Sequence, residues 1–326
     1  MRTPQATLLL LAFTTILVPT MCTADDRTVA GDDRFTQARD RIFQTFNDQV
    51  ERSWQGPYFF LQLADTQYGM FSGNTGFEKE AALAQQAVEH INRLRPRYVI
   101  VCGDLTNATP EHARYDVQVA QYKQDFSAID EDIPLVCVCG NHDIGNRPTE
   151  NSIATYKQNF GDDYFAFWVG GVCNVVLNSS VLKDPSGAPE VLEAQQEWLD
   201  LQLAAAGKAE AKHIFVFQHH PLFLTQPDEA DQYFNIPLTR RTPLLNQFQQ
   251  AGVRAVFAGH YHRNSHGQAG AMEMVTTGPV GKPFGNDVSG FRIVTVHEDR
   301  IRHQYCGMDD VPQAVDLQHA PPTGRD

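Results

Sequence analysis

Apolar positions follow two different periods in the first half of the chain. Short apolar runs, typical of buried strands, occupy residues 58–64, 97–102 and 133–139. Between them, over residues 77–94 and 110–129, apolar side chains recur about every 3.6 residues, as on one face of an amphipathic helix. The spacing of the runs leaves room for a strand-helix-strand unit each time, so this half predicts a parallel sheet.

The second half changes character. Two β-branched and aromatic runs joined by Gly170-Gly171 predict a hairpin, and the chain then alternates between helical and strand patterns. The last runs alternate as the strands of an antiparallel closing sheet would. The predicted elements are hairpin strands at 164–169 and 173–178, helices at 189–203 and 242–250, strands at 213–217 and 253–257, and tail strands at 272–276, 291–296 and 301–305.

The two ends of the chain differ from this pattern. Residues 1–24 have a basic start, an apolar stretch and a small-residue site before Asp25, which predicts a cleaved export signal and a periplasmic or secreted protein without a membrane span. A lipid anchor at Cys22 is the alternative. Residues 25–54 space Phe35, Ile42, Phe43, Phe46 and Val50 as a helical extension would. Residues 55–308 form the expected domain, and the Pro-rich, polar residues 309–326 predict a disordered tail.

Composition narrows the class of protein. A chain of 326 residues with 42% apolar residues can build one large core. The formal net charge of −13 disfavours nucleic acid as the main partner, because phosphate backbones would be repelled. Four of the six cysteines, at positions 102, 137, 139 and 173, lie inside predicted strands, which favours buried thiols over a disulfide framework.

Polar clusters follow five of the predicted strands. Since the carboxyl ends of parallel strands meet at one edge of a sheet, where α/β proteins keep their ligands, the clusters predict one shared site. A single Asp at such a place is more often a turn former or helix cap, but five clusters together favour metal binding. The clusters are Asp65-Thr66-Gln67, Gly103-Asp104-Leu105-Thr106-Asn107, Gly140-Asn141-His142-Asp143, His219-His220-Pro221 and Gly259-His260-Tyr261-His262.

The residue types in these clusters fit two divalent cations. A two-metal site needs a bridging carboxylate, and Asp104, on the middle strand of three, is the natural bridge. One ion would take Asp65, Gln67 and one histidine of the His260 and His262 pair. The other ion would take Asn141, His219 and the remaining histidine. Two such cations activate water for attack on phosphorus and neutralise the phosphoryl oxygens.

Further residues near the clusters are candidates for substrate contacts. His142, next to a ligand, is placed to protonate the leaving group or to hold phosphate. Asn107 is either a turn residue or a partner of His142 or the phosphate. Arg147 and Arg263 could hold phosphate, although a solvated surface position suits each of them too. Tyr233 lies in a loop, residues 222–241, that follows His219 and could stack on an aromatic substrate group.

In this order, the five clusters resemble the calcineurin-like metallophosphoesterase superfamily, and within it the calcineurin-like phosphoesterase domain-containing type described as Ser/Thr protein phosphatases. The resemblance implies a four-layer α/β-β/α sandwich with mixed sheets. It also implies how the ligands divide: Asp65, Gln67, Asp104 and His262 hold one metal, and Asp104, Asn141, His219 and His260 hold the other.

Two departures from the family pattern change the expectation. Gln67 stands where a histidine is usual, and its amide oxygen is a harder ligand, which favours Mn or Mg over Zn at that position. The expected cofactors are two divalent ions of Mn, Fe, Mg or Zn, with Mn favoured. The second cluster lacks the Asp-Arg-Gly ending of the large cytosolic protein phosphatases, and with it their phosphate-binding arginine. The expected activity is hydrolysis of phosphomonoesters, on a small molecule or a phosphoprotein; a phosphodiesterase, a nucleotidase or a non-catalytic metal-binding recognition module are the alternatives.

Overall fold

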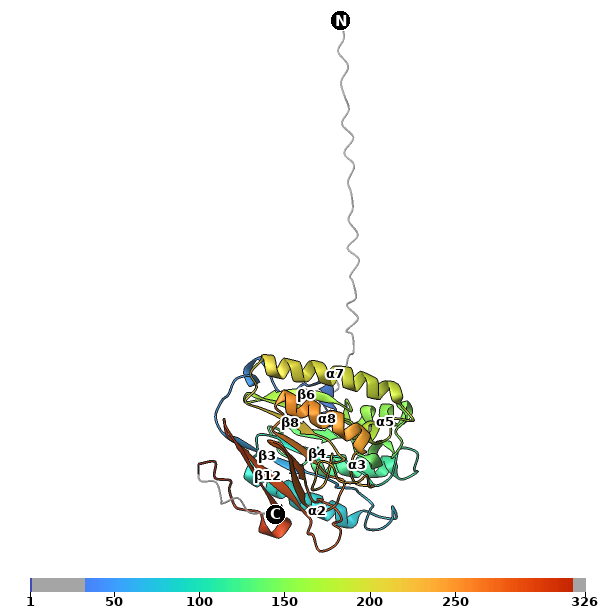
Figure 1. Ribbon diagram of the computed structural model, residues 1–326. Helices are drawn as coiled ribbons and strands as arrows, with labels where there is room; N and C mark the ends of the chain where they lie inside the picture. Colours follow the sequence, from blue (N-terminus) through green and yellow to red (C-terminus); the bar gives the residue numbers. More distant parts are fainter. Residues whose placement is uncertain (2–32, 319–326) are drawn as a thin grey trace. The chain divides into compact units, whose positions relative to one another are not determined.

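Two β-sheets pack face to face in residues 33–318, which with Met1 are the residues that the computed structural model describes. Helices cover the outer face of each sheet. On one side of the pair lie α7 (Pro189–Lys208) and α8 (Leu238–Ala251), and on the other lie α2 (Glu78–Leu94) and α3 (Tyr115–Phe126) (Figure 1). The four layers are those of the α/β-β/α sandwich that the resemblance implied.

The five-stranded sheet carries the predicted parallel core. Its order is β13-β12-β3-β4-β5, with β3, β4 and β5 parallel and the two late strands antiparallel at one edge. The strands are β3 (Tyr58–Leu63), β4 (Val99–Cys102), β5 (Leu135–Val138), β12 (Gly290–Val296) and β13 (Ile301–Gly307). Its helices are α2 (Glu78–Leu94), α3 (Tyr115–Phe126), α4 (Asn141–Ile144) and α5 (Glu150–Phe160).

The eight-stranded sheet has the order β1-β2-β6-β7-β8-β9-β11-β10, with β7, β8, β9 and β11 parallel to one another. The strands are β1 (Ala38–Arg39), β2 (Ile42–Phe43), β6 (Phe165–Val169), β7 (Val172–Val176), β8 (His213–Phe217), β9 (Ala255–Ala258), β10 (Ser265–Ala269) and β11 (Met272–Thr276). Its helices are α6 (Ser179–Lys183), α7 (Pro189–Lys208) and α8 (Leu238–Ala251).

The inner faces of the two sheets meet in an aromatic core. Phe60 of β3 stacks on Tyr98 with ring centroids 4.8 Å apart, and its other side meets Phe217 and Phe257 of the opposite sheet, each at 5.7 Å. Aromatic pairs of this kind add to the stability that burial alone provides. The sheets are therefore held in a fixed relation, which matters because both contribute strand ends to the site.

The predicted N-terminal helical extension is wrong within the described residues. A 3-10 turn, Arg34–Thr36, and the hairpin β1-β2 occupy this stretch, and only Asp48–Glu51 (α1) is helical. Asp40 and Arg41 have positive φ values of 54° and 64°, which close a tight turn that no helix tolerates. Strand β2 then pairs with β6, so the stretch belongs to the eight-stranded sheet.

The tail strands are also arranged differently from the prediction. Strands β12 and β13 are antiparallel, but β11 lies in the other sheet, parallel to β9 and antiparallel to β10. Past residue 308, Met308–Asp310 form a 3-10 turn and Val311 is buried, so the packed chain extends beyond the predicted boundary. Helix α5 and strand β10 are additional elements. The proposed signal and residues 319–326 lie outside the described residues.

The cysteines of the described residues lie in the protein core. The described cysteines, all buried and unpaired as expected of core thiols, are Cys102, Cys137, Cys139, Cys173 and Cys306.

Among residues 33–318, no helix combines the length and apolar character that crossing a bilayer requires.

Candidate metal centre

The five polar clusters converge at the carboxyl ends of the central strands. Asp65, Asp104 and Asn141 follow β3, β4 and β5, which are adjacent and parallel in one sheet. His219 and His260 follow β8 and β9, which are adjacent and parallel in the other. Because the two sheets face each other, the polar residues that follow their strands meet at one site. All five residues are buried, each with at most 4% of its surface exposed.

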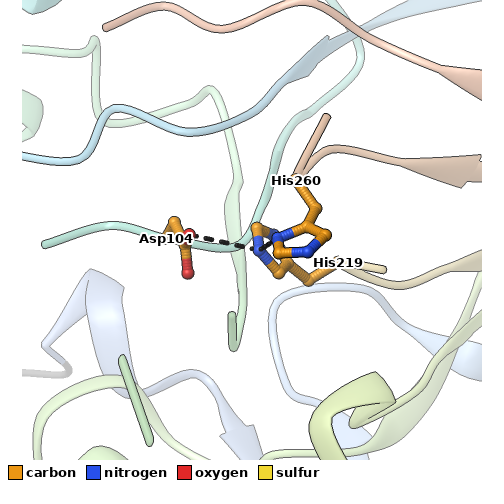
Figure 2. A group of neighbouring side chains, drawn as sticks. All are labelled: Asp104, His219 and His260. Carbon is orange, nitrogen blue, oxygen red and sulfur yellow. Dashed lines mark hydrogen bonds and ion pairs between the residues drawn. The ribbon is translucent and has the colours of Figure 1, made fainter. Parts of the chain in front are cut away.

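Two groups of side chains share Asp104. His219 and His260 form one group with it, Asp65 and His262 form the other, and the ligand atoms within each group lie within 4.8 Å of one another. Figure 2 shows the first group, in which His219 Nε2 is 3.2 Å from Asp104 Oδ2 and 3.1 Å from His260 Nδ1. Two atoms bonded to one ion at about 2.1 Å lie about 3.0–3.4 Å apart, so the spacing suits a shared cation.

Three histidines are oriented through their second ring nitrogen. His219 Nδ1 donates to the Cys102 carbonyl at 2.9 Å, and His262 Nδ1 donates to the Lys282 carbonyl at 2.5 Å. His260 Nε2 faces the Tyr233 carbonyl at 3.4 Å. A proton held on one nitrogen leaves the lone pair of the other for the cluster, and metal-binding histidines are fixed in this way.

Gln67 and Asn141 complete the donor set. The Oε1 atom of Gln67 is buried and has no hydrogen-bond partner, whereas its Nε2 donates to Asn107 Oδ1 at 3.2 Å. Asn141 Oδ1 faces His219 Nε2 at 3.0 Å. A buried oxygen without a partner is costly, and a cation beside it would satisfy it. The donors present therefore fit two divalent ions.

Backbone strain concentrates at this centre. Among the described residues other than glycine, ten have positive φ, and five of them are Asp65, Gln67, Asp104, His260 and His262, with φ between 41° and 69°. Such conformations cost about 1–3 kcal/mol each and persist where function requires them. The sharp turn that each one makes lets a side chain leave its strand and turn inward.

The loops that carry the candidate ligands are fastened to each other by short contacts. A Cβ on Gly140 would lie 2.2 Å from Asp104 Oδ1, so only glycine lets these loops approach so closely. Asp143 bridges them, because its carboxylate accepts from Gly140 N at 2.7 Å and from Leu105 N at 2.9 Å. Asp143 is thus a positioning residue that joins the loops after β4 and β5.

The charges of the centre are strongly coupled. Burial by itself would keep Asp104 neutral, but His219 and His142 outweigh it and hold the pKa of Asp104 below its ordinary value. Burial likewise disfavours the imidazolium of His219, but Asp104 and Asp65 outweigh it and raise the pKa of His219 to about 9. Burial and the neighbouring His219 lower the pKa of His260. Protons thus compensate the buried carboxylates in the metal-free protein.

The predicted substrate residues divide into two sets. His142 Nδ1 donates to the Asn107 carbonyl at 2.6 Å, and the backbone N–H of His142 donates to Asp104 at 2.8 Å, so His142 and Asn107 belong to the centre. The exposed ring of Tyr233 lies 5.0 Å from His260. Arg147 instead donates to the Ser186 carbonyl, and Arg263 lies over the Tyr261 ring at 5.5 Å; neither is placed on the ligand cluster by these contacts.

Sequence reasoning missed Ser179 and the supporting carbonyls. The buried Ser179 Oγ accepts the backbone N–H groups of His219 and His220 at 3.1 and 2.8 Å, and it contacts His220 Nδ1. Ser179 follows Asn178 at the end of β7, so a polar strand end was a visible signal here. The carbonyls of Cys102 and Lys282 had none, because a backbone atom is not specified by residue type.

A second group, His266, Glu273 and His303, also brings possible ligands together. Arg292 donates to His303 Nδ1 at 2.8 Å, which leaves His303 Nε2 to donate to Glu273. Glu273 also pairs with Arg254 at 3.1 Å. Because these side chains already pair with one another, the group is an ion-pair network. The cluster around Asp104 therefore remains the candidate metal site.

The sequence model of the calcineurin-like phosphoesterase family matches residues 59–264, the stretch that supplies all of these candidate ligands. The chain belongs to the calcineurin-like phosphoesterase family. Mouse serine/threonine-protein phosphatase CPPED1 is 42% identical over 292 residues, which cover 86% of this chain and 94% of the mouse protein. The human protein of the same name is 40% identical over 291 residues, covering 86% and 93%.

Solved structures show the same fold. A dimetal phosphatase from Danio rerio superposes with a TM-score of 0.59 at 18% identity, covering 78% of this chain and 97% of that one. A purple acid phosphatase, PPD1 of yellow lupin, also gives 0.59 at 15% identity, over 79% and 53%. GAP50, described as the anchor in the inner membrane complex of Plasmodium, gives 0.57 at 16% identity, over 79% and 87%.

Family membership settles the reaction class. This calcineurin-like phosphoesterase is a metal-dependent hydrolase of phosphoric esters that uses two divalent ions and acts on phosphorylated substrates.

The raised pKa of His219 predicts that metal binding at this centre depends on pH. Below about pH 9 a metal ion must displace the His219 proton, so the affinity for Mn²⁺ should rise up to about tenfold per pH unit and level off above that value. Isothermal titration at pH 7 and pH 8, in two buffers of different ionisation heat, measures both the affinity and the proton release. Equal affinity at the two pH values without proton release would contradict the assignment.

Proposed function

We propose that the protein hydrolyses phosphomonoesters at this centre. Asp65, Gln67, Asp104 and His262 would hold one divalent ion, and Asp104, Asn141, His219 and His260 the other. The observation that carries the proposal is the pair of buried groups that meet at Asp104, with their histidines oriented by carbonyls. Two divalent ions bound there supply charge neutralisation for the phosphoryl oxygens and acidify water.

The chain's own groups then handle the leaving group. His142 is held by the Asn107 carbonyl through Nδ1, so Nε2 is the nitrogen that can give a proton to the departing alkoxide. Its backbone N–H holds Asp104 Oδ1, which ties the acid to the bridging carboxylate. Asn141, the neighbour of His142, would fix the phosphate beside the second ion. We therefore assign His142 and Asn141 the catalytic roles.

Phosphoserine and phosphothreonine proteins are the substrates we favour, because the relatives at 40–42% identity bear the name serine/threonine-protein phosphatase. A phosphodiesterase or nucleotidase is the second candidate, supported by the exposed Tyr233 ring, 5.0 Å from the His260 ring, which could stack on a base. The alternative of another class, a non-catalytic module, is disfavoured by the membership of the phosphoesterase family, although GAP50, an anchor by description, shares the fold.

The loop after His219 is held by hydrogen bonds to its own acidic side chains. The Glu229 carboxylate accepts from the backbone N–H groups of Leu224 and Thr225 at 2.8 and 3.0 Å, and Asp231 accepts from Leu238 N at 2.6 Å. These two acids therefore stabilise the loop. Tyr233 is presented by this fixed frame as a substrate contact. Asn107, Arg147 and Arg263 are further candidates for phosphate binding.

Export is a separate proposal, and it rests on the N-terminal sequence alone. Residues 1–24 have the pattern of a cleaved signal, so the mature protein would begin at Asp25 in the periplasm or outside the cell. N-terminal sequencing of the protein from its producing cell, with fractionation, checks this. A chain that still begins at Met1 in the cytoplasm would contradict export.

Manganese is the metal we propose for the first site, because Gln67 offers a hard oxygen there. Replacing Gln67 by His should raise the affinity for Zn²⁺ at that site by about tenfold or more while changing the Mn²⁺ affinity less, since imidazole is the softer ligand. Isothermal titration with each metal measures the change. Unchanged Zn²⁺ and Mn²⁺ affinities would mean that Gln67 is not a ligand.

A substrate panel tests the activity itself. With Mn²⁺, p-nitrophenyl phosphate and phosphoserine or phosphothreonine peptides should be hydrolysed faster than bis(p-nitrophenyl) phosphate. Asn141→Ala should lower the rate at least 10–100-fold, because the second ion loses a ligand. Leu201→Ala, on the exposed face of α7, is the control that should keep full activity. Faster diester hydrolysis would favour the phosphodiesterase, and Mn²⁺ binding without any hydrolysis would support the non-catalytic module.

A further inference from the structure

Gln67 poses an orientation problem that histidine would not. An amide has an oxygen that binds cations and an NH₂ group that repels them, and the two can exchange places by rotation about one bond. A glutamine ligand therefore works only if its surroundings fix which end faces the metal. Inferring how this is done rests on the proposed function, in which Gln67 is a ligand of the first ion.

The fixed point is the backbone at the end of the second cluster. The N–H of Ala108 donates to Gln118 Oε1 at 2.8 Å, and the N–H of Asn107, which is shared with the Tyr68 carbonyl, donates to the same oxygen at 3.0 Å. A backbone N–H cannot become an acceptor. Gln118, which is fully buried on α3, must therefore point its Oε1 at these groups and its Nε2 away from them.

Each following amide inherits its orientation from the one before. Gln118 Nε2 donates to Asn74 Oδ1 at 2.8 Å, which makes that oxygen an acceptor. Asn107 Nδ2 donates to the same oxygen, also at 2.8 Å. Asn107 Oδ1 must then face the other way, where it accepts from Gln67 Nε2 at 3.2 Å. The remaining atom, Gln67 Oε1, is the buried oxygen without a partner.

The local backbone is built around this chain of amides. A Cβ on Gly69 would lie 2.4 Å from Gln118 Nε2 and 2.9 Å from Asn74 Oδ1, so glycine leaves the space in which the two amides meet. Asn74 has a φ of +69°, a conformation that asparagine tolerates better than most residues. Its backbone N–H donates to the Gly69 carbonyl at 2.8 Å.

We propose that Gln118, Asn74 and Asn107 form an amide relay that fixes the polarity of Gln67 and aims its oxygen at the first metal ion. The three are positioning residues, and Gln118 acts on the metal without touching it. The relay explains how an amide, a weak ligand that can turn over, replaces the usual histidine. Its orientation is fixed before the metal arrives, so metal binding does not have to offset the entropy of ordering it.

Two isosteric substitutions with the same added charge separate polarity from electrostatics. In Gln118→Glu the group facing Asn74 becomes an acceptor. The side-chain amides of Asn74, Asn107 and Gln67 must then each rotate by half a turn to keep their hydrogen bonds. As a result, Gln67 presents its NH₂ group to the metal. In Asn74→Asp the oxygen that accepts from Gln118 and Asn107 is retained, so the polarity is unchanged. A negative charge alone would strengthen cation binding in both variants.

The readout is Mn²⁺ binding at pH 8, by isothermal titration and by the electron paramagnetic resonance signal of a coupled Mn²⁺ pair. The relay predicts that Gln118→Glu weakens the first site by about 10–100-fold and loses the coupled signal at limiting Mn²⁺. Asn74→Asp should bind at least as tightly as the wild type. Circular dichroism of the metal-free variants verifies folding.

A second pair at one position covers the case in which Gln118→Glu does not fold. Asn74→Gly keeps the positive φ but removes the shared acceptor, so it should weaken the first site while Asn74→Asp does not. Wild-type affinity in Gln118→Glu or in Asn74→Gly would overturn the relay and leave the phosphatase proposal intact. Two tightly bound Mn²⁺ ions without hydrolysis would overturn the phosphatase proposal and leave the relay intact. Fewer than two bound ions in the wild type would overturn both proposals.

Discussion

The structure depends on one shared carboxylate. Asp104 lies where the ends of two facing sheets meet, buried among His219, His260, Asp65 and His262. A carboxylate in such a place is tolerated only with positive charge beside it, because desolvation otherwise exceeds what hydrogen bonds return. In the metal-free protein, protons on neighbouring imidazoles supply that charge, and in the proposed two-metal site two divalent ions would do so.

Holding this arrangement requires support at two levels. The aromatic core around Phe60 fixes the two sheets relative to each other, so that ligands from both reach one point. Around the site, neighbours orient three of the candidate ligands: carbonyls hold His219 and His262, and Asn107 holds Gln67. The strained backbone at the ligand loops is the cost, and the surrounding packing offsets it.

Much of this could be predicted because periodicity and strand ends are local signals. The helix expected at 77–94 is observed as Glu78–Leu94, and the polar residues after β3, β4 and β5 do converge. Near the N-terminus, however, the helical spacing of Phe35, Ile42 and Phe43 is coincidental, since the positive φ values at Asp40 and Arg41 carry no glycine or asparagine signal. Contacts between residues far apart in the sequence decide which sheet β11 joins. They also decide which amides and carbonyls support the candidate ligands.

The most direct test of the account is an anomalous-difference map from crystals soaked in Mn²⁺. Two peaks about 3.5–4 Å apart, on either side of the Asp104 carboxylate, are the predicted result. One of them should contact Gln67 Oε1 and His262, and the other Asn141 and His219. An empty site at full Mn²⁺ occupancy elsewhere, or a single ion that does not touch Asp104, would contradict the shared-carboxylate account.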